Sequence, residues 1–196
     1  MATLTENEKK ALLILFKDFT KYYNANSLSK EIMISRIGTM KMLKKLEKEE
    51  LLTRETIGKS ITYKVNMEND YAKDLITFLL SDQANRFKRW KDEFKDLFKK
   101  DRIIMLYGSA LHDYSKARDI DIMIVRKTGE GGDIYKIIRA RQKFIPKKIH
   151  AIDLTSEELI KNVKQRQEAI IDIVKNAVVL YGQNQYVELI KNVTSI

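Results

Sequence analysis

The chain has 196 residues, of which 37 are Lys or Arg and 27 are Asp or Glu, so its net charge is +10. Hydrophobic residues make up 44%, a globular balance that excludes general disorder, and the absence of Cys excludes disulfides, a thiol nucleophile and Cys-ligated zinc. No apolar run reaches the ~18–20 residues of a membrane span, and residues 1–20 lack a signal-peptide pattern, so we expect a cytoplasmic protein without membrane contact.

The positive charge is unevenly distributed. Residues 1–66 carry 13 basic and 8 acidic side chains, residues 67–101 carry 8 of each, and residues 102–196 carry 16 and 11. This pattern predicts two basic modules joined by a charge-balanced connector. The excess charge favours a polyanionic partner, although a generally lysine-rich composition would produce it too.

Residues 1–66 have the pattern of three short helices and a hairpin. Thr5 precedes two glutamates, which is typical of a helix start, and a second helix is expected to run to Ile34 from a Ser27 or Ser29 cap. Ser35 is expected to cap a third helix with a buried stripe of Ile37, Met40, Leu43 and Leu46. Two strands should follow around a turn at Gly58-Lys59, with Ile61, Tyr63 and Val65 alternating on the second.

The order helix, helix, helix, hairpin resembles a winged helix-turn-helix domain, and the segment from Ile34 to Arg54 resembles its recognition helix and first wing strand. The resemblance implies a third helix in the DNA major groove and a wing on the phosphate backbone. It places three residues near bases: Arg36, Thr39 and Lys41. It places four near phosphates: Lys44, Lys45, Arg54 and Lys59. Winged helices also serve as protein-docking modules, and that alternative stays open.

The connector, residues 67–101, has a helical pattern from Asp70 to Lys100. Its aromatic and aliphatic residues recur at heptad-like spacing: Phe87, Trp90, Phe94 and Leu97. We interpret this seam as core packing or as the surface of a homodimer, rather than as a ligand site.

The strongest chemical signal lies in residues 102–196. An apolar strand, residues 103–107, ends at Gly108-Ser109, and a second strand from Asp119 to Val125 places Asp119 and Asp121 on one face. Two such anions repel each other unless a cation lies between them, and carboxylates suit Mg²⁺ or Mn²⁺. Two ions held by shared carboxylates form the arrangement used in phosphoryl and nucleotidyl transfer.

A third expected strand, residues 147–154, supplies another carboxylate. Its alternation places Ile149, Ala151 and Asp153 on one face, so we expect Asp153 beside the first pair, where it could hold a metal and take a proton from an acceptor hydroxyl. His150 lies one residue off this face and is interpreted as packing. Gly108 lets the backbone approach a phosphate, which the Ser109 hydroxyl and the following N–H groups could hold.

Gly108-Ser109, nine residues, Asp119-Ile120-Asp121 and the later Asp153 together resemble the signature of polymerase β-type nucleotidyltransferases, in particular their small "minimal" members. The resemblance implies an α+β fold with a mixed sheet, and transfer of an NMP from an NTP with release of pyrophosphate. It implies that Asp119, Asp121 and Asp153 ligate two Mg²⁺ (or Mn²⁺) ions and that Gly108 and Ser109 hold the triphosphate.

The loop departs from the family pattern at two positions. Asp113 stands where many relatives have Gly, and Arg118 stands where many have Ser. Arg118 and Lys116 could reach the triphosphate or could be solvated.

The remaining segments read as helices. One is expected from Asp133 to Lys143, with an outward basic face (Lys136, Arg139, Arg141 and Lys143) that could follow nucleic acid or be solvated. A second is expected from Thr155 or Ser156 to about Leu180, ending at Gly182, and a last one from Tyr186 to Lys191. The segment Leu180-Tyr181-Gly182 also resembles the end of the family's domain.

Two functions follow as hypotheses. In the first, the protein is a Mg²⁺-dependent nucleotidyltransferase that modifies an unknown acceptor, such as a protein or an RNA, and binds DNA through its winged helix. In the second, it is a DNA-binding transcriptional regulator whose second domain is an inactive nucleotide sensor or scaffold; Asp113 and Arg118 motivate this alternative.

Overall fold

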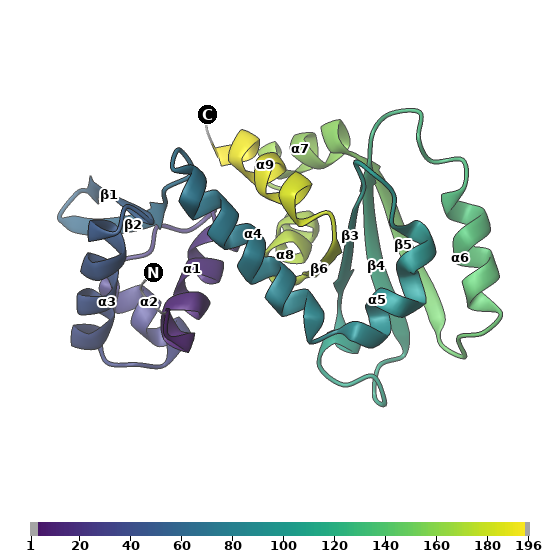
Figure 1. The fold of residues 1–196 in the computed structure, drawn as a ribbon, viewed down its shortest axis with the longest axis horizontal. Helices are drawn as coiled ribbons and strands as arrows, with labels where there is room; N and C mark the ends of the chain where they lie inside the picture. The colour runs from purple at the N-terminus through teal and green to yellow at the C-terminus, as the bar shows by residue number, and fades with distance from the viewer. Residues whose placement is uncertain (1–3, 195–196) are drawn as a thin grey trace. The chain divides into compact units, whose positions relative to one another are not determined.

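The fold was obtained as a computed structural model that describes residues 4–194. It is α+β, as the sequence predicted, with one two-stranded and one four-stranded sheet (Figure 1). The chain forms two compact units, Met1–Leu79 and Leu80–Ile196. The division falls inside helix α4 (Asp70–Asn85), within the segment predicted to connect two modules. Within residues 4–194, no helix is long and apolar enough to cross a membrane.

The first unit contains three helices followed by a hairpin: α1 (Glu6–Lys17), α2 (Ala25–Ile32), α3 (Arg36–Lys48), β1 (Leu52–Ile57) and β2 (Ser60–Val65). A capping box at Thr5 begins α1, and the Ser35 hydroxyl accepts the Gly38 N–H at the start of α3. The predicted serine cap of α2 is wrong: Asn24 caps it, because the Asn24 side chain accepts the N–H groups of Asn26 and Ser27.

The buried face of α3 differs from the prediction. Ile37 is 64% exposed and Met40 is 42% exposed, whereas Thr39 is fully buried. The inward stripe is Thr39, Met42, Leu43 and Leu46. Burial of Thr39 is tolerated because its hydroxyl donates to the Ser35 carbonyl at 3.1 Å, which leaves no unpaired polar atom.

The connector is not one long helix. After α4, the chain forms α5 (Lys88–Phe94) and the 3₁₀ turn η1 (Lys95–Leu97), because Phe87 has a non-helical backbone between α4 and α5. The aromatic seam is core packing: Trp90, Phe94 and Leu97 are buried in the hydrophobic cluster of the second unit. The side chains of the seam therefore pack within the chain's own core.

The second unit is built on a mixed sheet with the strand order β5-β4-β3-β6. Strand β3 (Ile103–Tyr107) runs antiparallel to β4 (Asp119–Arg126) and to β6 (Val178–Tyr181), and β5 (Lys148–Thr155) runs parallel to β4. The predicted helix from residue 155 to residue 180 is wrong. It divides into α7 (Ser156–Lys164), α8 (Glu168–Asn176) and β6, because Arg166 has a positive φ of 54° and the apolar run after Ala177 pairs with β3.

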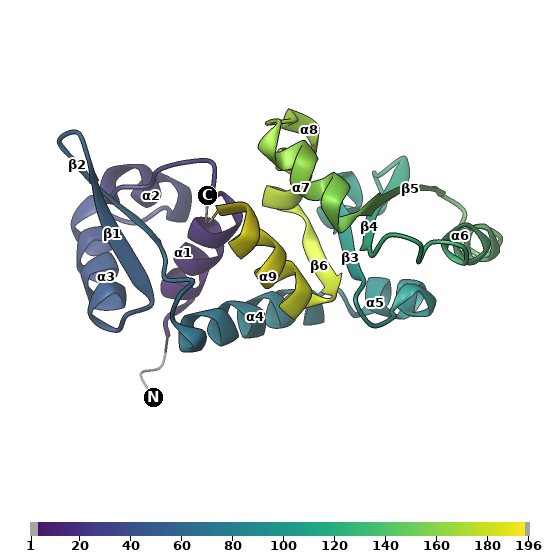
Figure 2. The same ribbon diagram turned by 90° about the horizontal axis from the view of Figure 1, so that it is seen from above.

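Helices cover both faces of this sheet (Figure 2). The face of Ile120, Ile122 and Ile124 packs against α5 and against α6 (Ile134–Gln142). Helices α7, α8 and α9 (Gln183–Thr194) lie on the other face. Asp119 and Asp121 alternate with the buried isoleucines, so they belong to this second face.

Candidate metal site on the sheet

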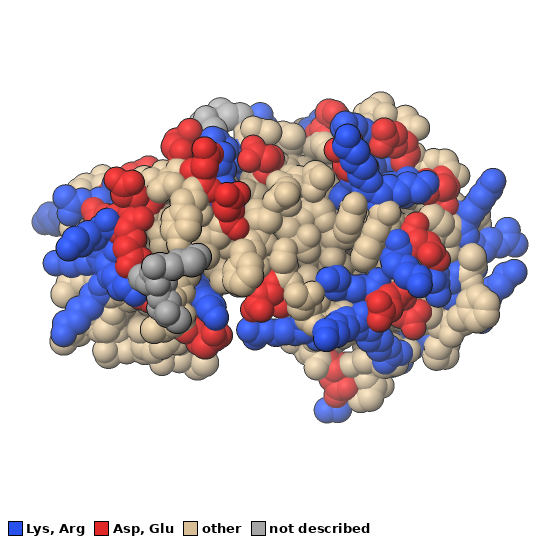
Figure 3. Space-filling view, in the orientation of Figure 1, with Lys and Arg blue, Asp and Glu red and all other residues tan. Residues whose placement is uncertain are grey.

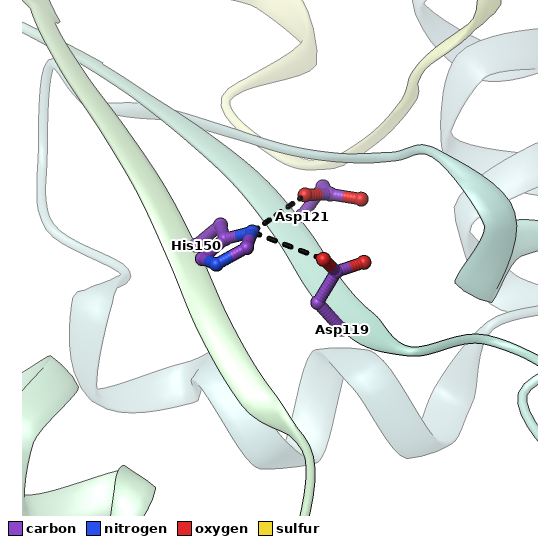
Figure 4. A group of neighbouring side chains, drawn as sticks. All are labelled: Asp119, Asp121 and His150. Atoms are coloured by element: carbon purple, nitrogen blue, oxygen red, sulfur yellow. Dashed lines mark ion pairs between the residues drawn. The ribbon is translucent and has the colours of Figure 1, made fainter.

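Three neighbouring strands bring polar side chains together where β3 ends and where β4 and β5 begin. The register pairs Asp121 of β4 with Tyr107 of β3 on one side and with His150 of β5 on the other. Paired residues share a face of the sheet, so the three side chains form a row, with Asp119 two residues before Asp121 on the same face. Figure 4 shows His150 pointing from β5 toward both carboxylates.

The distances fit a single cation site. His150 Nδ1 lies 3.2 Å from Asp119 Oδ2 and 3.6 Å from Asp121 Oδ1. One ligand atom from each of Asp119, Asp121 and His150 lies within 4.8 Å of the others. All three residues are half-buried, so an ion could enter from solvent. The two carboxylate oxygens suit Mg²⁺ or Mn²⁺, and the imidazole nitrogen is a ligand that Zn²⁺ and Fe²⁺ also accept, so the mixed donor set can hold a divalent cation.

The site concentrates negative charge. Burial raises the pKa of Asp121, the Asp119 carboxylate raises it further, and His150 partly opposes both effects. Burial, together with Asp121 and Asp119, raises the pKa of Tyr107 to about 12, so its hydroxyl remains a neutral donor near pH 7. A divalent cation between the carboxylates would relieve their repulsion.

Asp153 is not part of this group, contrary to the prediction. It pairs with Ile124 of β4 and therefore lies on the opposite face of the sheet, where Arg126 Nε donates to its carboxylate at 2.8 Å. Residues three apart on a strand face opposite ways, so β5 cannot present both His150 and Asp153 to the pair. The side chain of Ile149 points into the hydrophobic cluster. Because neighbouring residues of a strand face opposite ways, His150 faces the carboxylates.

Gly108 packs directly against the site. It has a φ of 76°, and a Cβ added to it would lie 2.2 Å from Asp121 Oδ2. Only glycine allows this approach of the β3 end to the carboxylate. Ser109 follows it, is exposed and begins a short 3₁₀ turn, η2 (Ser109–Leu111). The structure thus brings the Gly108 backbone next to Asp121, and binding of a triphosphate by Gly108 and Ser109 stays a prediction.

The loop between η2 and β4 carries the other predicted nucleotide-binding residues. Lys116 is exposed and lies 3.4 Å from the Asp113 carboxylate, and Arg118 is exposed just before Asp119. The Asp113 carboxylate also accepts hydrogen bonds from the Ser115 hydroxyl at 2.6 Å and the Ser115 N–H at 2.9 Å. It therefore stabilises the turn in this loop. Lys116 and Arg118 make no ion pair with Asp119 or Asp121.

Lys147, the residue before β5, fixes the same loop. Lys147 Nζ donates to the carbonyl oxygens of Tyr114, Ser115 and Ala117 and lies over the Tyr114 ring. The interpretation of His150 as a packing residue is wrong, because its ring lies beside Asp119 and Asp121, and no pattern in the sequence pointed to Lys147 or Tyr107. The buried Ile149 was the available signal: with Ile149 in the core, strand alternation assigns His150 to the face of Asp119 and Asp121.

Some of the predicted DNA-binding residues of the first unit are exposed without an ion pair, and others are held in ion pairs. Arg36, Lys41 and Lys44 on α3, and Lys59 at the hairpin turn, are exposed and form no ion pair with any residue from 4 to 194. Lys45 instead pairs with Glu8 at 2.7 Å, and Arg54 pairs with Glu47 at 3.1 Å. Thr39 is buried, so the prediction that it contacts bases is wrong.

The exposed face of α3 is therefore basic at its rim and apolar at its centre. Ile37 and Met40 lie among Arg36, Lys41 and Lys44 on this face. Figure 3 shows Lys and Arg side chains gathered at the left edge of the view, over α3 and the hairpin.

Comparisons with known proteins identify no relative: no family model matches the chain, and neither the curated proteins nor the solved structures give a match.

Proposed function

We propose that the second unit is a nucleotidyltransferase that uses a divalent metal, Mg²⁺ or Mn²⁺, and that the first unit binds DNA. The observation that supports the enzyme most is the packing of the Gly108 backbone against Asp121 beside Asp119 and His150. In this reaction the acceptor hydroxyl attacks the α-phosphorus of a nucleoside triphosphate. An O–P bond to the acceptor forms, the bond to pyrophosphate breaks, and the hydroxyl proton passes to a base.

The residues divide these tasks. Asp119 and Asp121 would hold one metal ion, with His150 as a third ligand or as the base for the acceptor proton. The metal would neutralise the triphosphate and orient it toward the acceptor. The Gly108 backbone packs against Asp121, and the exposed Ser109 hydroxyl that follows it would donate to a phosphate of the nucleotide. The donor set fits one ion rather than the two first expected, since Asp153 lies on the other face.

The test is a calorimetric titration of each NTP with Mg²⁺ or Mn²⁺ into the full-length chain. We expect metal-dependent binding of at least one NTP, lost in Asp119→Asn/Asp121→Asn and weakened in His150→Ala. Asp153→Asn is the matched control, because it removes one carboxylate from the opposite face. Incubation with an NTP labelled at the α-phosphate then measures transfer to protein or RNA acceptors.

The outcomes separate the possible arrangements. Binding that survives Asp153→Asn and fails in the double variant supports the site described here. Equal loss in Asp153→Asn would mean that β5 has a different register in solution. Absence of binding for every NTP at millimolar concentration would exclude the enzyme and leave the second unit as a scaffold.

DNA binding by the first unit rests on the exposed basic rim of α3 and on Lys59 at the hairpin. Selection from a random duplex pool should yield a preferred sequence. Lys41→Glu/Lys44→Glu should weaken binding by at least tenfold at 0.1 M salt, because each lost phosphate contact also removes a counterion release. Lys88→Glu/Lys100→Glu, an equal charge change at exposed positions of the second unit, should leave it unchanged.

The second candidate is a DNA-binding regulator whose second unit senses a metal–nucleotide complex without turnover. The position of Asp153 favours it, because within residues 4–194 no third carboxylate joins Asp119 and Asp121. Nucleotide binding without any transfer of the labelled α-phosphate, together with a change in DNA affinity, would select this candidate. The aromatic seam is packed into the core, so homodimerisation is not part of either proposal.

A further inference from the structure

Helix α6 and the turn after it present a basic and aromatic surface that neither proposed activity uses. We define the α6 face by five residues: Tyr135, Lys136, Arg139, Lys143 and Phe144. Lys136, Arg139 and Lys143 are three and four residues apart, Tyr135 and Phe144 adjoin the first and last of them, and Ile134 on the inner side of α6 is buried in the core. In Figure 3, Lys and Arg side chains gather over α6 at the right edge of the view.

The charge of this segment is entirely positive. Residues 134–150 contain six basic residues and no Asp or Glu. Two of the six act inside the fold, since Arg141 pairs with Asp96 at 2.9 Å and Lys147 binds backbone carbonyls. Lys136, Arg139 and Lys143 are exposed and have no ion-pair partner within residues 4–194. An uncompensated cluster of this kind is complementary to a polyanion.

Two large aromatic rings lie within the same face. Tyr135 is 73% exposed and Phe144 is 79% exposed, at the two ends of the row of basic residues. Exposed rings beside cations are the combination that binds single-stranded nucleic acid, because each ring stacks on an unpaired base while the cations contact phosphates. Paired bases in a duplex do not offer their faces for such stacking, and an apolar protein partner would not require the charge.

The α6 face is separate from the metal site. Ile134 and Ile145 pack on the sheet face of Ile120 and Ile122, whereas Asp119, Asp121 and His150 lie on the other face. We infer that the α6 face binds single-stranded nucleic acid through backbone phosphates and base stacking.

The test measures fluorescence anisotropy of labelled U12 and dT12 oligonucleotides with the full-length chain, across a salt series and with excess unlabelled duplex DNA to occupy the first unit. Tyr135→Ala/Phe144→Ala should raise Kd about tenfold or more, the loss expected when stacked bases are released. Tyr135→Phe keeps the ring and should stay within about twofold of wild type. Lys136→Glu/Arg139→Glu should raise Kd and flatten the salt dependence.

A matched control removes exposed rings elsewhere. Tyr71 and Phe78 on α4 are also an exposed Tyr and Phe, so Tyr71→Ala/Phe78→Ala should leave Kd unchanged. Tighter binding of U12 or of dT12 identifies RNA or DNA as the preferred strand, and either supports the inference. The inference would be overturned if Tyr135→Ala/Phe144→Ala left the affinity unchanged. It would also be overturned if heparin displaced the labelled strand as effectively as unlabelled oligonucleotide, because the surface would then bind polyanions in general. Neither result depends on metal–NTP binding.

Discussion

At the scale of single residues, the candidate site depends on one close contact. The Gly108 backbone fills the space beside Asp121 that a side chain would occupy, and its φ of 76° is one that other residues rarely adopt. Gly129 has a similar φ of 85°, but nothing lies within 4 Å of its added Cβ. Substituting Gly129 therefore tests backbone strain alone, whereas substituting Gly108 tests backbone strain together with the contact to the carboxylate.

We expect Gly108→Ala and Gly129→Ala each to lower the free energy of unfolding by about 1–2 kcal/mol, because both force a side chain into the left-handed region. Only Gly108→Ala should also abolish metal–NTP binding, since its Cβ displaces Asp121. Thermal denaturation and calorimetry on both variants measure the two effects. Retained binding in Gly108→Ala would show that Asp121 is not held by this contact.

The carboxyl groups of Asp121 and Asp133 should affect stability in opposite directions. Burial and Asp119 raise the pKa of Asp121, so ionising it in the folded state is unfavourable, and its destabilising effect appears as pH rises through the raised pKa. Arg102, and then Lys99, lower the pKa of Asp133, so its stabilising effect is present above the pKa of the unfolded chain and lost as pH falls through the lowered one.

Asp121→Asn should therefore raise the free energy of unfolding at pH 7 without added metal and lose this advantage near pH 3. Asp133→Asn should lower stability at pH 7, with a smaller effect near pH 3. Urea denaturation of both variants and wild type at the two pH values tests the signs. If both variants changed the free energy of unfolding with the same sign at pH 7, the opposite effects assigned to Asp121 and Asp133 would be contradicted.

At the scale of elements, the periodicity of β5 decides which residues reach the site. Ile149 packs in the core, so His150 faces Asp119 and Asp121, and Asp153 faces Arg126. The start of the same strand is preceded by Lys147, which holds the loop before β4. One short segment thus supplies a candidate metal ligand, a core residue and the lysine that binds the loop before β4.

Replacing Lys147 by Met keeps the length of the side chain and removes its donors to the carbonyls of Tyr114, Ser115 and Ala117. We expect a loss of about 1–3 kcal/mol in stability and faster hydrogen exchange in residues 112–118. Lys148→Met, at the exposed neighbouring position, is the control and should do neither. Equal exchange in the two variants would show that Lys147 does not order the loop.

At the scale of the whole molecule, each candidate surface lies within one compact unit. The exposed basic residues of α3 belong to Met1–Leu79, and the carboxylates, His150 and Gly108 belong to Leu80–Ile196. Helix α4 contributes to both units, since the division falls between Leu79 and Leu80, which are both buried. A separation of the units must therefore keep all of α4 with each part.

Fragments 1–85 and 70–196 should each retain one activity. We expect 1–85 to bind the selected duplex with the affinity of the full chain, and 70–196 to bind metal–NTP with unchanged affinity, provided that circular dichroism shows native helix content. A fragment 70–196 that folds but binds no NTP, when the full chain does, would mean that the site needs the first unit.

The sequence by itself determined much of this protein. The α+β class, the capping signals at Thr5 and Ser35, and the strands that begin near Ile103 and Asp119 all follow from local patterns. These features depend on neighbours a few residues apart, so alternation, turn chemistry and spacing are sufficient to predict them.

Tertiary structure alone decided the rest. A short apolar run such as residues 177–181 suits a helix end or a strand, and pairing with β3 makes it β6. The inward face of α3 was set by which side packs, so Thr39 is buried and Ile37 is exposed. On β5, burial of Ile149 in the core places Asp153 on the face opposite to Asp119 and Asp121, because alternate residues of a strand face opposite sides of the sheet.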